Sequence, residues 1–315
     1  MDILYLLGGL AVLLVSGDFL VKGSVSLAKY LKVSKLVIAV TIVSLGTSAP
    51  ELLVSLKAAI SGHPDIAIGN VIGSNISNIA LVLGLSSLII VIPVAKNTVN
   101  FDWPVMMLAS LLFYVFILNN SLERWEGFIF LLLLAGYITY SIMKSRRQKQ
   151  PEPEKEEKKY PLALALLFIA LSSVGLVFGS EWLVDGAIGI AHYFDVSEHV
   201  ISVSVIAVGT SIPELATSLI AAIKKQLDIS VGNIIGSNIF NIFAILGTTS
   251  VVTDIPVNNM VKYNDIFWML GISLMLFLLI VLFKRGKLNW LKGLILLAAY
   301  ITYIYMVFGS KEIVQ

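Results

Sequence analysis

The sequence contains no cysteine and only three histidines among its 315 residues. The missing thiols exclude disulfide bonds, thiolate metal sites and cysteine nucleophiles, and the few histidines disfavour an imidazole-rich zinc centre. Charged residues are also scarce, at 13% against about 25% in soluble globular proteins. The net charge is only +2 and the cations are spread over many short segments, so no nucleic-acid-binding surface is expected.

Apolar residues make up 57% of the chain, a composition that places most of it in lipid. A helix needs roughly 20 apolar residues to cross a membrane. We therefore predict an all-α polytopic membrane protein with ten transmembrane helices. The predicted spans lie near residues 3–30, 34–60, 66–92, 104–119, 125–143, 161–192, 199–223, 229–252, 266–283 and 290–308.

The distribution of Lys and Arg predicts the orientation, because short cytoplasmic loops are enriched in both. With the N-terminus outside, 17 cations fall on the inside and 4 on the outside, while Lys22 lies within the first span. We expect a multi-pass protein of the plasma membrane with both termini outside. The polar segment 145–160, SRRQKQPEPEKEEKKY, is expected to be a flexible cytoplasmic linker. The inside set is Lys29, Lys32, Lys35, Lys96, Lys144, Arg146, Arg147, Lys149, Lys155, Lys158, Lys159, Lys224, Lys225, Lys284, Arg285, Lys287 and Lys292, and the outside set is Lys57, Arg124, Lys262 and Lys311.

The strongest signal is an internal duplication. Residues 41–84 and 204–247 align without a gap at a constant offset of 163. The duplication divides the chain into two five-helix halves, 1–144 and 161–315, joined by the linker. An odd number of helices inverts the second copy, and 5+5 inverted repeats are typical of alternating-access transporters. The alternative, a duplicated scaffold without transport, would not need polar, helix-breaking residues at the bilayer midplane.

Each copy carries a helix-breaking motif, GTSAPE at 46–51 and GTSIPE at 209–214. Proline lacks an N–H and interrupts a helix, so we expect broken second and seventh helices with freed main-chain carbonyls in mid-membrane. Glu51 and Glu214 end these motifs. A carboxylate at that depth is costly and by default marks an ion path, although either glutamate alone is also compatible with a protonated structural side chain.

A second motif follows in each copy, GNVIGSNISN at 69–78 and GNIIGSNIFN at 232–241. Its glycines have the spacing that lets helices approach closely. The serine and the last asparagine of each motif are four apart and share a helix face. These pairs are Ser74 with Asn78 and Ser237 with Asn241, whereas Asn70, Asn75, Asn233 and Asn238 are interpreted as structural hydrogen bonders.

The two motifs together offer carboxylate, amide, hydroxyl and main-chain oxygens, with no nitrogen or sulfur ligand. Hard oxygen donors suit sodium or calcium, while magnesium demands stricter octahedral geometry and soft metals prefer thiolate or imidazole. Two carboxylates give the site a charge near −2, which one Ca²⁺ or two or three Na⁺ would balance. Competition for shared ligands would then be the basis of exchange.

At these motifs the sequence resembles the sodium/calcium exchanger group of the calcium/cation antiporter superfamily. The resemblance implies a 5+5 inverted fold with the ion core in the second, third, seventh and eighth spans. It also implies that Glu51 and Glu214 coordinate calcium. The other implied ligands are Thr47, Ser48, Ser74, Thr210, Ser211 and Ser237, the main-chain oxygens of Ser44 and Ala207, and Asn78 and Asn241.

The predicted function is exchange of Na⁺ for Ca²⁺ by alternating access, without enzymatic activity or a cofactor and as a monomer. The motif GxxxxGK[ST] is missing, which disfavours an ATP-driven pump. Potassium-dependent members of the resembled group carry Asp where this chain has Asn241, so exchange is expected to be independent of potassium. The alternatives are a proton/calcium or other cation/calcium antiporter and, with less support, a cation channel.

Overall fold

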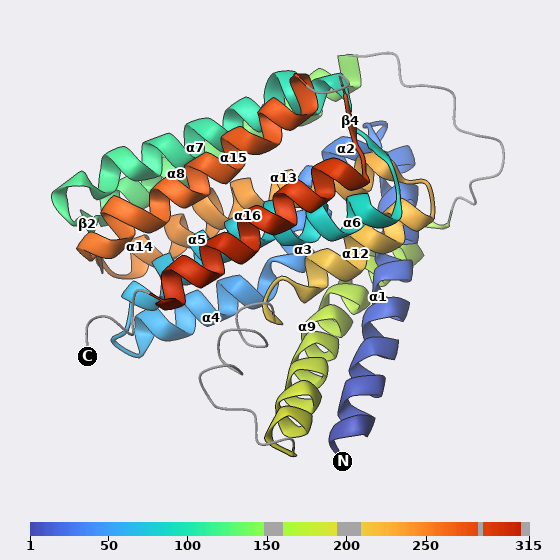
Figure 1. The fold of residues 1–315 in the computed structure, drawn as a ribbon. Coiled ribbons are helices and arrows are strands. Elements are labelled where there is room, and N and C mark those ends of the chain that lie inside the picture. The colour runs from blue at the N-terminus through green and yellow to red at the C-terminus, as the bar shows by residue number, and fades with distance from the viewer. Residues whose placement is uncertain (148–159, 194–208, 283–285, 310–315) are drawn as a thin grey trace.

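The structure is a computed structural model that describes residues 1–147, 160–193, 209–282 and 286–309 (Figure 1). It is all-helical apart from two pairs of two-residue strands. The first copy contains α1 (Asp2–Leu31), α2 (Lys35–Ile38), η1 (Ala39–Val43), α3 (Ser44–Thr47), α4 (Ala49–Ile60), α5 (Asp65–Ser77), η2 (Asn78–Leu83), α6 (Gly84–Ile89), β1 (Ile92–Pro93), η3 (Thr98–Asp102), α7 (Trp103–Phe116), η4 (Ile117–Asn119), β2 (Ser121–Leu122) and α8 (Arg124–Arg147). The second contains α9 (Leu162–Tyr193), α12 (Ile212–Ile223), α13 (Leu227–Phe240), η6 (Asn241–Leu246), α14 (Gly247–Val252), β3 (Ile255–Pro256), η7 (Val261–Asp265), α15 (Ile266–Val281), β4 (Lys287–Leu288) and α16 (Trp290–Gly309).

Among the described residues, 7 helices are long and apolar enough to cross a membrane, and a bent pair makes up to 8. The bent pair, Lys35–Thr47 with Ala49–Ile60, turns by 47° at the predicted break. Only residues 209–223 of the predicted seventh span are described, with the helix Ile212–Ile223 among them, and the tenth span corresponds to the shorter apolar helix Trp290–Met306. The protein is therefore a helical membrane protein, and the count of ten spans stays a prediction, as does the linker, most of which (148–159) lies outside the described residues.

The elements repeat along the chain with the offset found in the sequence. The helices α4 and α12, the turns η2 and η6, and the strands β1 and β3 each begin 163 residues apart. Strand β1 pairs with β4, and β2 pairs with β3, both antiparallel. Each strand pair therefore joins one copy to the other.

The repeat motifs lie in the main apolar core, and a pair of long helices lies beside them. The helices α5 and α13 with their following turns lie in the main apolar core, and residues 229–243 are buried without interruption. The long helices α1 and α9 pack along each other and project from the rest of the molecule (Figure 1). The polar motifs therefore sit at the centre, and the α1–α9 pair lies beside them.

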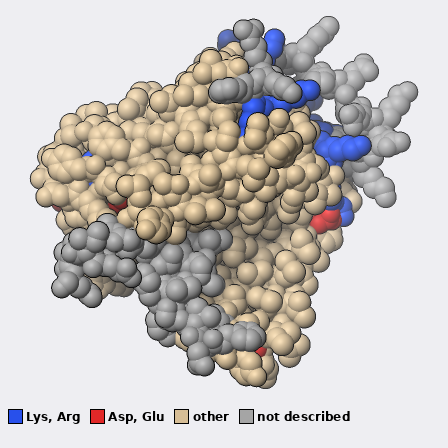
Figure 2. Space-filling model, viewed as in Figure 1, with Lys and Arg blue, Asp and Glu red and all other residues tan. Residues whose placement is uncertain are grey.

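Segments expected on the cytoplasmic side lie together. The main-chain N–H of Ser34, just after α1, donates to Ser145 Oγ near the end of α8 at 2.7 Å. Lys35 Nζ donates to Gln226 Oε1, just after α12, at 2.9 Å. On the face shown in Figure 2, Lys and Arg side chains gather at one end of the molecule.

The glycine spacing of the second motif brings two helices together at Gly236. A Cβ added at Gly236 would meet Ser44 Oγ and come within 2.5 Å of Val40 Cα, because α13 lies directly against η1 and α3. At Gly73, the equivalent position, an added Cβ would meet no described atom within 4 Å. Close helix approach is thus shown at the second copy's glycine.

We predict that Gly236→Ala lowers stability while Gly136→Ala, at an exposed position of α8, does not. Overpacking of a tight contact costs about 1–3 kcal/mol, whereas alanine in an open helical position gains about 1 kcal/mol over glycine. Thermal unfolding of both purified variants in detergent tests this pair. Equal shifts in melting temperature would contradict the packing difference.

Candidate functional site

The two glutamates lie in the first turn of a new helix in each copy. Ser48 (φ −85°, ψ 11°) and Ser211 (φ −88°, ψ 2°) have left the helical conformation, and α4 and α12 begin at the next residue with a proline in the first turn. Glu51 and Glu214 are the acidic residues of these first turns and are fully buried. A helix N-terminus stabilises negative charge, so the break provides a favourable potential for each carboxylate.

A π-helical turn begins at each candidate asparagine. The helix α5 passes into η2 at Asn78, and α13 passes into η6 at Asn241. Single π turns are rare and occur frequently at functional sites. Nothing in the residue pattern predicted these turns.

Side chains of both copies meet at Glu214. Ser48 Oγ of the first copy donates to Glu214 Oε1 at 3.0 Å, and Ser237 Oγ donates to the same oxygen at 3.3 Å. Thr47 Oγ1 lies 3.4 Å from Ser237 Oγ and donates to Asn233 Oδ1 at 3.1 Å. The first break and the second copy's buried helix therefore form one polar cluster.

Glu51 belongs to the same cluster. Its helix α4 packs against η6, and α12 packs against η2, so each glutamate-bearing helix contacts the π turn of the other copy. Both carboxyl groups are fully buried. Asn241 Nδ2 donates to Ser74 Oγ at 2.9 Å, which joins the remaining serine across the copies.

Six buried oxygens of this cluster have no hydrogen-bond partner among the residues that the structure describes. Buried polar atoms are nearly always paired, because an unpaired one loses its solvation without compensation. A concentration of unpaired oxygens, with both carboxylates among them, fits a hard cation that takes oxygen ligands. The six are Glu51 Oε1 and Oε2, Glu214 Oε2, Asn78 Oδ1, Asn241 Oδ1 and Ser211 Oγ.

The structure brings most of the predicted site residues together. Thr47, Ser48, Glu51, Ser74, Asn78, Ser211, Glu214, Ser237 and Asn241 are all buried. The Ser44 main-chain oxygen accepts the Ser48 N–H at 2.9 Å. The Ser44 hydroxyl donates to the Asn233 main-chain oxygen at 3.0 Å. Thr210 is partly exposed and lines a separate cavity, and Ala207 lies outside the described residues.

The sequence patterns did not single out two serines that accept hydrogen bonds from the motif asparagines. Asn70 Nδ2 donates to Ser55 Oγ at 3.0 Å, and Asn233 Nδ2 donates to Ser218 Oγ at 3.2 Å. Ser55 and Ser218 occupy equivalent positions of the repeat, 163 residues apart. That repetition outside the two motifs was the signal that would have identified them.

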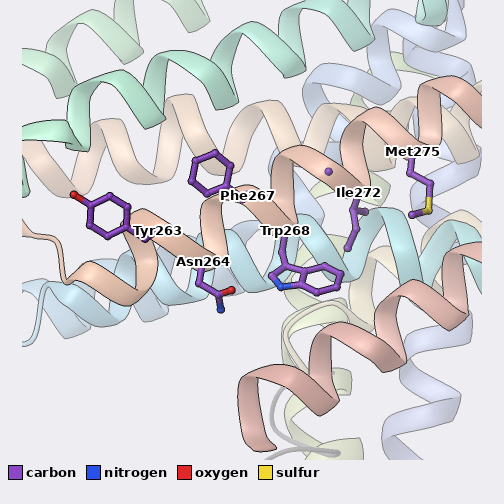
Figure 3. A pocket seen from close by; sticks show the side chains of 7 residues that line it. Tyr263, Asn264, Phe267, Trp268, Ile272 and Met275 are labelled. Atoms are coloured by element: carbon purple, nitrogen blue, oxygen red, sulfur yellow. The ribbon is translucent and has the colours of Figure 1, made fainter. Parts of the chain in front are cut away.

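A cavity of about 370 Å³ lies along η7 and α15 (Figure 3). Its labelled side chains are aromatic, apolar or amide, with Tyr263, Phe267 and Trp268 along one side of the helix. None of its lining residues is charged. It therefore cannot balance a dehydrated cation, and it is distinct from the glutamate cluster.

A second cavity, of about 230 Å³, lies between α4 and α9 next to the first break. Pro50 and Thr210 line it together with Glu181 and Asp185 of α9. The position of α1 equivalent to Glu181 is Asp18, which pairs with Lys22 at 2.6 Å and with Lys224 after α12. Glu181 therefore lines a cavity in the second copy, whereas the equivalent Asp18 of the first copy forms ion pairs.

Comparison with known proteins gives a match over both copies. The family described as sodium/calcium exchanger protein matches residues 1–143 and 164–309. The chain is 32% identical to the sodium/calcium exchanger MaX1 of Methanosarcina acetivorans over 98% of each chain. It is 33% identical to the inner membrane protein YrbG of Escherichia coli, over 98% of this chain and 97% of that one.

Solved structures give the same match. The sodium-calcium exchanger NCX_Mj, soaked with zero Na⁺ and Ca²⁺, superposes with a TM-score of 0.82 at 33% identity. The superposition covers 97% of this chain and 98% of the other. Sequence and fold therefore agree along the whole chain.

Proposed function

Because the chain belongs to the sodium/calcium exchanger family, we propose that it is a secondary antiporter that exchanges Na⁺ for Ca²⁺ across the plasma membrane. The supporting observation is the buried cluster of unpaired oxygens around Glu51 and Glu214. The relative MaX1 is named a sodium/calcium exchanger, and the superposed NCX_Mj is a sodium-calcium exchanger. We further propose that one chain carries out the whole cycle as a monomer, because both glutamates come from the same chain.

The ions would bind between the two copies. Glu51 and Glu214 would supply the charge, and the amide oxygens of Asn78 and Asn241 would complete the shell together with nearby hydroxyls. A net site charge near −2 is balanced by one Ca²⁺ or by two Na⁺, and leaving it unbalanced in a dry site costs several kcal/mol. Ca²⁺ and Na⁺ would therefore exclude each other, which couples their movements.

Alternating access is supported by the different surroundings of the two copies. The cavity lined by Pro50 and Glu181 lies between α4 and α9, whereas Asp18 and Lys224 close the equivalent α1–α12 contact with an ion pair. A ten-helix 5+5 inverted repeat would exchange these two arrangements when the other face opens. The crossed strand pairs, which join the copies at two places, fit that arrangement.

Sodium-driven uptake is the direct test. Proteoliposomes loaded with sodium should accumulate calcium-45 when diluted into sodium-free buffer, and collapse of the sodium gradient should stop it. Dependence on a pH gradient instead would identify a proton/calcium antiporter. Calcium flux without any counter-ion would identify a channel.

We predict that Glu51→Gln and Glu214→Gln each abolish sodium-dependent calcium uptake. Removing one carboxylate leaves Ca²⁺ half neutralised in a buried site, at a cost of about 3–5 kcal/mol. Glu126→Gln is the matched control, since Glu126 is also buried but its carboxylate accepts the Glu123 N–H at 2.8 Å. Normal uptake by either site variant, with the control equally active, would refute the ligand assignment.

Exchange should proceed without potassium. The amide of Asn241 donates to Ser74 and Asn75, and it adds no charge to the site. A bound K⁺ in addition to Ca²⁺ would leave an unbalanced positive charge, which is unfavourable in a dehydrated pocket. Uptake should be equal when choline replaces potassium. A parent protein that is silent until potassium is added would overturn this electrostatic argument.

Cysteine labelling tests the proposed orientation, because the chain has no cysteine of its own. Ser61, between α4 and α5, and Arg147, at the end of α8, are both exposed. We expect an impermeant maleimide to label Ser61→Cys in intact cells and Arg147→Cys only after permeabilisation. The reverse pattern would show that the termini face the cytoplasm.

A further inference from the structure

We propose that Asn75 and Asn238 are positioning residues that turn the amide oxygens of Asn78 and Asn241 toward the transported ions. This inference rests on the proposed function and extends it to residues outside the ligand set. Both asparagines are buried at equivalent places in the second motif of each copy, 163 residues apart.

The need for positioning follows from amide chemistry. A primary amide carries an acceptor oxygen at one end and two N–H donors at the other. Only the oxygen end can coordinate a cation, and the donor end repels it. A buried amide ligand therefore requires a neighbour that occupies its NH₂ group and so decides which end faces the ion.

Such a neighbour exists for each candidate ligand, and it comes from the other copy. Asn78 Nδ2 donates to Asn238 Oδ1 at 3.1 Å, and Asn241 Nδ2 donates to Asn75 Oδ1 at 3.0 Å. With the NH₂ groups held in this way, Asn78 Oδ1 and Asn241 Oδ1 are buried and have no hydrogen-bond partner within the described part of the chain. The two contacts are related by the repeat.

The positioning residues are themselves fixed by main-chain atoms. Asn238 Nδ2 donates to the main-chain oxygen of Asn75 at 3.1 Å, and Asn75 Nδ2 donates to the main-chain oxygen of Asn238 at 3.4 Å. A main-chain carbonyl can only accept, so each amide must present its NH₂ to the opposite helix. Its Oδ1 is thereby left to accept from the ligand asparagine. The orientation of each ligand is therefore set by the backbone of α5 and α13.

This arrangement predicts a crossed dependence. Asn75 of the first copy acts on Asn241 of the second, while Asn238 of the second acts on Asn78 of the first. Loss of a residue that orients a metal ligand typically weakens metal binding by about 10- to 100-fold. Asn75→Ala and Asn238→Ala should each raise the KM for calcium by this order and leave Vmax within about twofold.

Double-mutant cycles test the crossed pattern. Asn75→Ala should add almost nothing in an Asn241→Ala background and should keep its full effect in an Asn78→Ala background. Asn238→Ala should show the opposite. Calcium binding is also measured by the calcium-induced rise in melting temperature, which gives a signal even where a ligand variant no longer transports.

A purely structural role would give a different result. If each asparagine only held α5 against α13, its effect would be the same in both backgrounds, and that outcome would overturn the proposal. Asn75→Ser and Asn238→Ser, which leave smaller cavities, repeat the cycles if the alanine variants fail to fold. Ser86→Ala and Thr249→Ala, which truncate buried hydroxyls at another equivalent pair of positions, should leave the KM unchanged.

The proposed function and the positioning role can be refuted by different results. A parent protein that takes up no calcium under a sodium gradient refutes the proposed function. A parent that transports, but whose variants show additive effects in every background, refutes only the positioning role.

Discussion

Two glutamate side chains lie fully buried at the centre of a membrane protein, far from the water that would solvate their charge. The penalty for such a charge is several kcal/mol after relaxation, and the surrounding architecture is arranged to offset it. Each carboxylate sits in the first turn of a helix, where backbone N–H groups favour negative charge. Hydroxyl groups of both copies donate to Glu214, and a bound cation would offset what remains.

The candidate site residues could be found from the sequence because the duplication repeats them. Glu51 and Glu214, with the break before each, follow from proline chemistry and from the rarity of carboxylates in lipid. The bend of 47° at the first break agrees with that reasoning. Ser74 and Ser237 were placed on the correct buried face by their spacing from Asn78 and Asn241.

Other features depend on contacts between segments far apart in the chain, which residue spacing does not encode. The π turns at Asn78 and Asn241 are one such feature, since the same residues fit an ordinary helix. Another is the difference between Thr47, which is buried in the cluster, and Thr210, which lines a cavity beside α9. The two threonines occupy equivalent positions in nearly identical motifs, so the sequence predicted one role for both. Their difference comes from their neighbours, because α3 packs against α13 while Thr210 lies beside α9.

The hydrogen bonds between the two copies also affect how the protein can fold during its synthesis. The side chains of Asn75 and Asn238 each donate to the other copy's main chain, and β1 finds its partner only in β4, near the end of the second copy. During synthesis, the first five predicted helices emerge before any of these partners exists. The central amides of the first half therefore have no partner from the second copy until α13 has been made, and β1 has none until β4 follows.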